Sequence, residues 1–217
     1  ALVAAPHRSP APALLFGDGE ASSLSVERLG QLRELLAQAC LAWEALRLRR
    51  EVEDLTRTDH DTGLYNRREL ELRFSQERAR ARRAEAPLSL LLLGASVAAE
   101  PAMLAAELRG LGGVLRHELR AVDIAARFDQ AELAVLLPGA GSLEAALVAR
   151  RVGVTAYRRS LAPCVGVASY PDDCDHPDDL VALAKSNLDA AREAGPGHAS
   201  LSGGDAPIVF AEEAGDA

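Results

Sequence analysis

Aromatic side chains are scarce in this sequence, since Phe, Trp and Tyr together make up only 4% of its 217 residues. Apolar residues nevertheless account for 48% of the chain, which is enough to bury a hydrophobic core. Such a core must therefore be built mainly from leucine, alanine and valine. The length fits either one domain with an appendage or two small domains.

Long apolar runs are missing as well. No run approaches the length that a transmembrane helix needs, and no segment resembles a signal peptide. The three cysteines, Cys40, Cys164 and Cys174, form an odd set without close pairing, which favours reduced thiols in a cytoplasm. We therefore expect a cytoplasmic protein without a membrane partner.

The sequence also lacks an excess of positive charge, because its formal net charge is -8. This balance argues against a nucleic-acid partner, whose binding depends on the neutralisation of many phosphates. A small anionic ligand remains compatible with the charge, since it needs only a local cluster of arginines.

The N-terminal part favours two short strands followed by a long helix. Residues 1–22 are rich in Ala, Pro and Gly, and apolar pieces at 1–5 and 13–16 predict strands joined by a loop. Residues 23–55 predict a helix with a heptad-like apolar seam. The seam consists of Leu29, Leu32, Leu36, Ala39, Trp43 and Leu46. It fits a dimeric coiled coil and packing on the helix's own domain equally well.

The remaining chain alternates between helix and strand patterns, which indicates an α/β fold with helices packed on a sheet. Gly63 predicts a turn, and Asn66 can cap the helix that follows. The later predicted elements are a strand at 88–93, a helix from Pro101, a hairpin of 124–128 and 133–137, a helix at 143–157, a strand at 164–169, a helix at 177–194 and an edge strand at 208–210.

Two motifs make this region similar to one family. Residues 58–68 read TDHDTGLYNRR, and residues 120–133 read RAVDIAARFDQAEL. Both resemble bacterial GGDEF domains, the modules that make cyclic di-GMP and share the fold of nucleotidyl-cyclase palm domains. The resemblance implies a GGDEF domain at 58–200, followed by an acidic tail at 201–217. Residues 1–22 resemble the end of a GAF sensor domain, and 23–57 its signalling helix or coiled-coil stalk.

The resemblance breaks down at the family's catalytic positions. The strand that carries metal-binding acids in the family ends here in Gly94-Ala95-Ser96. The GGDEF signature is replaced by Asp129, Gln130, Ala131, Glu132 and Leu133. Because joining two GTP molecules needs carboxylates that hold two metal ions, one surviving acid does not rebuild the site. We expect no diguanylate cyclase activity, no bound Mg²⁺ and no other cofactor.

The family's regulatory site is better preserved. Arg120 and Asp123 match its Arg-x-x-Asp motif, and Asp123 lies five residues before the signature position, as the family requires. A further family arginine on the helix after the hairpin falls, in ungapped register, on Arg151, with Arg150 beside it. Arginine can grip guanine or phosphate in a bidentate manner, and a carboxylate accepts hydrogen bonds from guanine. The resemblance therefore implies a cyclic di-GMP site at these four residues.

The sequence leads to three functional hypotheses. The first is an inactive GGDEF-type receptor that binds cyclic di-GMP and forms a homodimer through its N-terminal helix or acts on a partner protein. The second is a nucleotide-free domain that serves dimerisation or protein docking. The third is a residual cyclase or a GTP-binding regulator. An Arg-x-x-Asp motif is short, and Arg120 and Asp123 can also form an ordinary surface ion pair of little energetic value.

Overall fold

The computed structural model describes residues 26–95, 101–202 and 208–210, with side chains in 30–48, 56–95, 102–202 and 208–210. The chain divides after Leu55 into two compact units. In the first, α1 (Val26–Leu55) is one helix of 30 residues, which confirms the long N-terminal helix. The strands predicted in 1–22 lie outside the described residues. None of the described helices is long and apolar enough to span a membrane.

The described part of α1 leaves much of its apolar surface exposed. Trp43 and Leu46, both in the predicted seam, are 42% and 54% exposed, and Leu35, Leu41 and Leu48 are also exposed. Leu32 and Leu36 are half-buried. The side chain of Leu29 lies outside the described residues. The dimer seam on this helix therefore stays a prediction.

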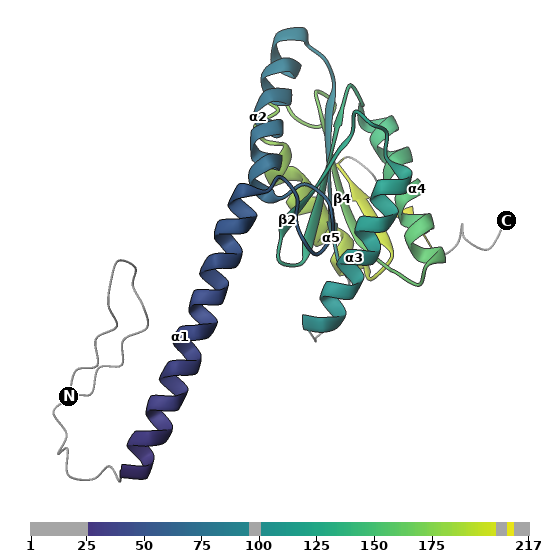
Figure 1. Ribbon diagram of the computed structural model, residues 1–217. Coiled ribbons are helices and arrows are strands. Elements are labelled where there is room, and N and C mark those ends of the chain that lie inside the picture. The colour runs from purple at the N-terminus through teal and green to yellow at the C-terminus, as the bar shows by residue number, and fades with distance from the viewer. Residues whose placement is uncertain (1–25, 96–100, 203–207, 211–217) are drawn as a thin grey trace. The chain divides into compact units, whose positions relative to one another are not determined.

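The second unit is a six-stranded sheet in the order β2-β3-β1-β4-β5-β6, with helices on both faces (Figure 1). Its strands are β1 (Leu88–Gly94), β2 (Ile124–Asp129), β3 (Glu132–Pro138), β4 (Cys164–Tyr170), β5 (His198–Leu201) and β6 (Ile208–Val209). Its helices are α2 (Arg67–Ala84), α3 (Pro101–Glu118), α4 (Ser142–Arg158) and α5 (Leu180–Ala194). The predicted α/β class is therefore confirmed.

The leucine run of β1 explains why this strand lies in the middle of the sheet. Every residue of β1 is buried, and strand side chains alternate between the two faces. Leu91 and Leu93 pack in the core beneath α3 and α4, whereas Leu90 and Leu92 pack in the core beneath α2 and α5. Because both faces are covered by helices, β1 carries one polar side chain, the buried Ser89, rather than an alternation of polar and apolar residues.

The register of the central strands places the end of β1 beside the signature positions at the tip of the β2–β3 hairpin. β1 runs antiparallel to β3, and Gly94 pairs with Glu132. On its other side β1 runs antiparallel to β4, with Gly94 opposite Cys164. The end of β1 and the start of β3 therefore form one edge of the sheet, at the tip of the β2–β3 hairpin.

The structure differs from the sequence-based elements mainly near the C-terminus. The short strand β5 was not predicted, and it pairs in parallel with β4. β6 lies at the edge of the sheet, where the sequence placed a strand, and pairs with β5. Helix α5 begins at Leu180 rather than at Pro177, because 177–179 form a turn. Phe210 follows β6 and is fully buried.

Candidate functional site: the turn between α3 and β2

Segment 56–66, which follows α1 in the chain, is folded by its own polar side chains. The Asp59 carboxylate accepts hydrogen bonds from the backbone N–H and the hydroxyl of Thr62, at 2.8 and 2.6 Å. Gly63 has a φ of +67°, a conformation that favours glycine, so the predicted turn is confirmed. The Asn66 side chain accepts from the backbone N–H of Glu69 at 2.9 Å, which confirms the helix cap.

Backbone hydrogen bonds of Tyr65 join this segment to the edge of the sheet. The Tyr65 backbone N–H donates to the Ala125 carbonyl at 3.1 Å, and the Arg127 N–H donates to the Tyr65 carbonyl at 2.8 Å. The Arg73 guanidinium stacks on the Tyr65 ring, 4.3 Å from its centroid. Segment 56–66 therefore lies next to β2 and close to the turn that leads into it.

The Arg-x-x-Asp motif forms the tight turn between α3 and β2. The Asp123 carboxylate accepts from the Arg120 backbone N–H at 2.9 Å, and the Asp123 N–H donates to the Arg120 carbonyl at 3.1 Å. The two residues are thus held together by the backbone of the turn. Arg120 is exposed and Asp123 is half-buried, so both side chains can reach a ligand.

A pocket of about 570 Å³ lies beside this turn, within the size range of small-molecule sites. Arg120 and Asp123 line it together with Arg116, Gly63 and Tyr65. Its remaining wall is mainly apolar, formed by residues such as Leu64, Leu115, Leu119 and Ala125. The pocket brings Arg116, Arg120 and Asp123 together, and such side chains can recognise a base and its phosphate.

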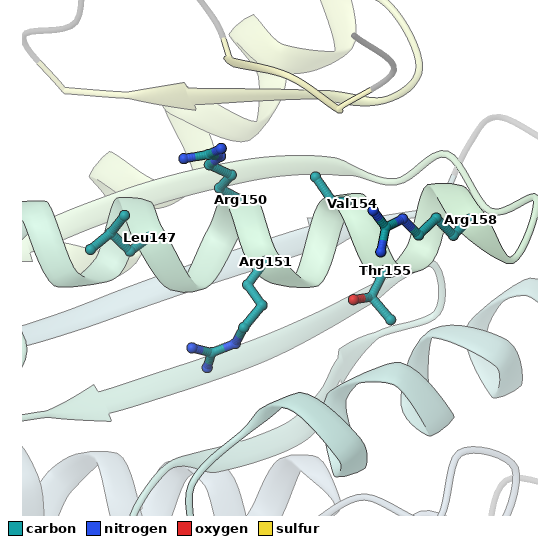
Figure 2. A pocket seen from close by; sticks show the side chains of 6 residues that line it. All are labelled: Leu147, Arg150, Arg151, Val154, Thr155 and Arg158. Atoms are coloured by element: carbon teal, nitrogen blue, oxygen red, sulfur yellow. The ribbon is translucent and has the colours of Figure 1, made fainter. Parts of the chain in front are cut away.

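The other two predicted ligand residues do not line this pocket. Arg150 and Arg151 lie on α4, in a separate depression of about 360 Å³ that also includes Leu147, Val154 and Arg158. Figure 2 shows that Arg150 and Arg151 point to opposite sides of the helix. The structure therefore brings Arg120 and Asp123 together but not all four residues, and the role of Arg150 and Arg151 in the ligand site stays a prediction.

Arg151 is engaged with the end of α3, two residues before Arg120. Its Nε lies 3.2 Å from Oε2 of Glu118, and its Nη2 donates to the Glu118 carbonyl at 2.8 Å. The Thr155 hydroxyl donates to Oε1 of Glu118 at 3.1 Å. Glu118 was not predicted, although its place two residues before the motif was a usable signal. These contacts join α4 to the C-terminal end of α3.

The region around Glu132 and Gly94 is filled by cationic side chains from α5. Oε1 of Glu132 accepts from Lys185 Nζ and, at 2.9 Å, from Arg192 Nη2, and the Glu132 side chain is only 6% exposed. A Cβ at position 94 would lie 2.7 Å from Arg192 Nη2. The Arg192 guanidinium thus occupies the space beside Gly94. A divalent cation near Glu132 would meet two positive charges at short range.

The remaining signature positions shape the hairpin tip. Asp129 and Gln130 are exposed, and Arg127 donates to the carbonyl oxygens of both, at 2.6 Å to Asp129. The Ala131 carbonyl accepts from the Ala95 N–H at 3.1 Å, and Leu133 is fully buried. Ser96 lies outside the described residues. Within the described part of the chain, no group of three or more His, Cys, Asp or Glu residues could hold a metal ion.

The acidic loop after β4 serves the fold. The Asp172 carboxylate accepts from the Ser142 N–H at 2.6 Å and so caps α4 from a distant loop. The Asp173 carboxylate accepts from the Ser169 N–H at 2.8 Å, and burial raises the pKa of this carboxyl group. Asp178 pairs with Arg78. Asp172, Asp173 and Asp178 are therefore engaged in contacts within the fold, which explains their presence without a cation site.

Two of the thiols, those of Cys164 and Cys174, have raised pKa values. Burial raises the pKa of the Cys164 thiol, and it outweighs the opposing effect of the nearby Arg192 charge. Burial also raises the pKa of Cys174, and Asp179 and Asp173 raise it further. A thiol with a raised pKa is mostly protonated at neutral pH and reacts slowly.

Comparison with solved structures identifies the fold. The GGDEF domain of FimX from Pseudomonas aeruginosa is 20% identical, with a TM-score of 0.58; the match covers 67% of this chain and 98% of that one. The GGDEF domain of DgcB from Caulobacter crescentus, in complex with cyclic di-GMP, is 16% identical, with a TM-score of 0.61 and coverage of 68% and 94%.

A third similar structure contains a protein partner. Diguanylate cyclase SiaD from Pseudomonas aeruginosa, in complex with its activator SiaC, is 23% identical, with a TM-score of 0.57 and coverage of 78% and 72%. No family model matches this chain, and no curated protein does. The chain has the fold of GGDEF domains, as its two motifs predicted.

Proposed function

We propose that this chain is a catalytically inactive GGDEF-type signalling domain that binds cyclic di-GMP at the turn between α3 and β2. The observation that carries this proposal is the pocket in which Arg120 and Asp123 lie side by side. Arg120 grips the acceptor edge of one guanine, and Asp123 accepts hydrogen bonds from the guanine N–H groups. DgcB, which has the same fold, is known in complex with this dinucleotide.

The second part of the proposal is that this chain does not synthesise cyclic di-GMP. The support comes from Glu132, whose Oε1 contacts both Lys185 and Arg192. Two protein cations thus lie next to the one acid that the chain retains from the signature. With alanine at position 131 and glycine at 94, the carboxylates that would hold magnesium against a triphosphate are lacking at these two positions.

A role in protein docking is the alternative, and one surface favours it. Leu143 and Leu147 on α4 are 72% and 52% exposed, and Arg150 and Arg158 lie on the same helix. SiaD, which shares the fold, is known in complex with a protein activator. In this alternative the domain binds no nucleotide and acts through α4 or through a homodimer of α1.

Titration of the chain with cyclic di-GMP separates these possibilities. We expect saturable heat at micromolar ligand in isothermal titration calorimetry, with far weaker binding of GTP, because one GTP lacks the second guanine and carries a larger charge. Measuring both ligands on the same preparation controls for protein quality. If wild-type protein gives neither heat nor saturation with cyclic di-GMP, the receptor proposal fails and the docking alternative takes its place.

Incubation with GTP tests the loss of synthesis. We expect no cyclic di-GMP, by chromatography, after prolonged incubation with GTP and either Mg²⁺ or Mn²⁺, because two-metal catalysis needs more than one carboxylate. An active diguanylate cyclase in a parallel reaction shows that the assay conditions support turnover. Formation of cyclic di-GMP by this chain would contradict the proposal and favour a residual cyclase.

A further inference from the structure

A second arginine lies in the pocket of the Arg-x-x-Asp turn and has no counterpart in the motif. Arg116 lies in the last turn of α3, four residues before Arg120 of the turn that follows, and both line the pocket. Their side chains therefore border the same space. The sequence analysis did not select Arg116, although this spacing from Arg120 was visible.

Arg116 is held at the pocket by segment 56–66. Its Nη1 donates to the Thr62 carbonyl, and a Cβ at Gly63 would lie 2.6 Å from the same nitrogen. The glycine therefore leaves the space in which the guanidinium lies. A guanidinium has five N–H donors, and a single bond to Thr62 leaves the others for a ligand.

The polar side chains of the pocket can bind different parts of a nucleotide. Arg120 and Asp123 together match the hydrogen-bonding edges of one guanine. When they are used in this way, the phosphate of the same nucleotide still needs a counter-charge, and Arg116 is the other cation that lines the pocket. The apolar wall completes a site for one base and its phosphate.

We propose that Arg116 is the phosphate-binding residue of this pocket. The inference rests on the proposed binding of cyclic di-GMP and adds a residue and a consequence to it. A ligand phosphate on Arg116 also lies against Gly63 and Tyr65, because both line the same pocket. Binding therefore tightens segment 56–66, the part of the chain that directly follows α1.

The test uses charge-changing and charge-keeping variants of the full chain. In calorimetric titration with cyclic di-GMP, we expect Arg116→Gln to weaken binding by about tenfold or more, the loss typical of a charge-assisted hydrogen bond. Arg116→Lys keeps the charge, and we expect it to stay within about threefold of wild type. Arg109→Gln, an exposed change on the same helix and away from the pocket, is the matched control and is expected to bind like wild type.

Each other outcome has a distinct meaning. Unchanged binding by Arg116→Gln, with intact binding by wild type, overturns the role of Arg116 and leaves the proposed function standing. Equal loss in the glutamine and lysine variants, together with a lowered melting temperature, assigns Arg116 to holding Thr62 and also overturns the inference. Absence of binding by wild type overturns the proposed function and this inference together.

Discussion

Replacing Arg120 with alanine is expected to weaken the binding of cyclic di-GMP by up to about 100-fold, because a bidentate arginine–guanine contact contributes about 1–3 kcal/mol. Such a loss removes saturable binding at micromolar ligand. The change should leave the fold intact, since Arg120 is exposed and the turn is held by its backbone N–H and by the Asp123 carboxylate. Calorimetric titration measures the loss, and thermal unfolding of the same sample verifies the fold.

The control for this substitution is an arginine without a place in the pocket. Arg80 on α2 is 70% exposed and makes only an ion pair with Glu77, so Arg80→Ala should bind cyclic di-GMP like wild type. Asp123→Asn should also weaken binding, since an amide replaces one acceptor of the guanine N–H groups with a donor. If Arg120→Ala binds as tightly as wild type, the ligand does not occupy this turn.

Replacing Phe210 with alanine is expected to lower the free energy of unfolding by about 3–5 kcal/mol, the usual cost of removing a fully buried aromatic ring. Phe210 is fully buried and packs on α4 at Gly153, where a Cβ would lie 2.3 Å from the ring. The ring thus fills the space that the glycine leaves, and alanine would leave a cavity between α4 and the sheet. Denaturant unfolding followed by circular dichroism measures the change.

Leu143→Ala provides the matched control for this stability prediction. Leu143 is 72% exposed on the same helix, so truncating it should change the free energy of unfolding by less than about 0.5 kcal/mol. An unfolding midpoint for Phe210→Ala that equals that of wild type would show that residues beyond β5 do not contribute to the core.

Individual strands, helix caps and turns of this protein could be predicted because residues close together in the sequence determine them. The leucines of β1 could only be a buried strand or a short buried helix segment, and their number fits a strand. Asn66 caps α2 through a bond that spans three residues, and Gly63 adopts the turn conformation. The short strand β5 escaped prediction because its four residues carry too little pattern, and its pairing with β4 is a distant contact.

The candidate site was also predictable only in part. Arg120 and Asp123 were predictable as neighbours, since only two residues separate them. Arg116 was missed because an arginine at a helix end usually signals only solvation or a favourable interaction with the helix dipole. Its role depends on Thr62, which is 54 residues away. Arg151 was placed on the correct helix, but its contact with Glu118 depends on how α4 packs against α3.

The amino-acid sequence alone predicted the class of fold and the closeness of Arg120 and Asp123, and it places no acid at positions 94 and 131. These depend on residue identity and on periodicities of two to four residues, which are readable along the chain. Tertiary structure alone decided that Lys185 and Arg192 close over Glu132, and that Arg116 joins the pocket. Such contacts join residues more than fifty positions apart, and their distances are set by how the helices pack on the sheet.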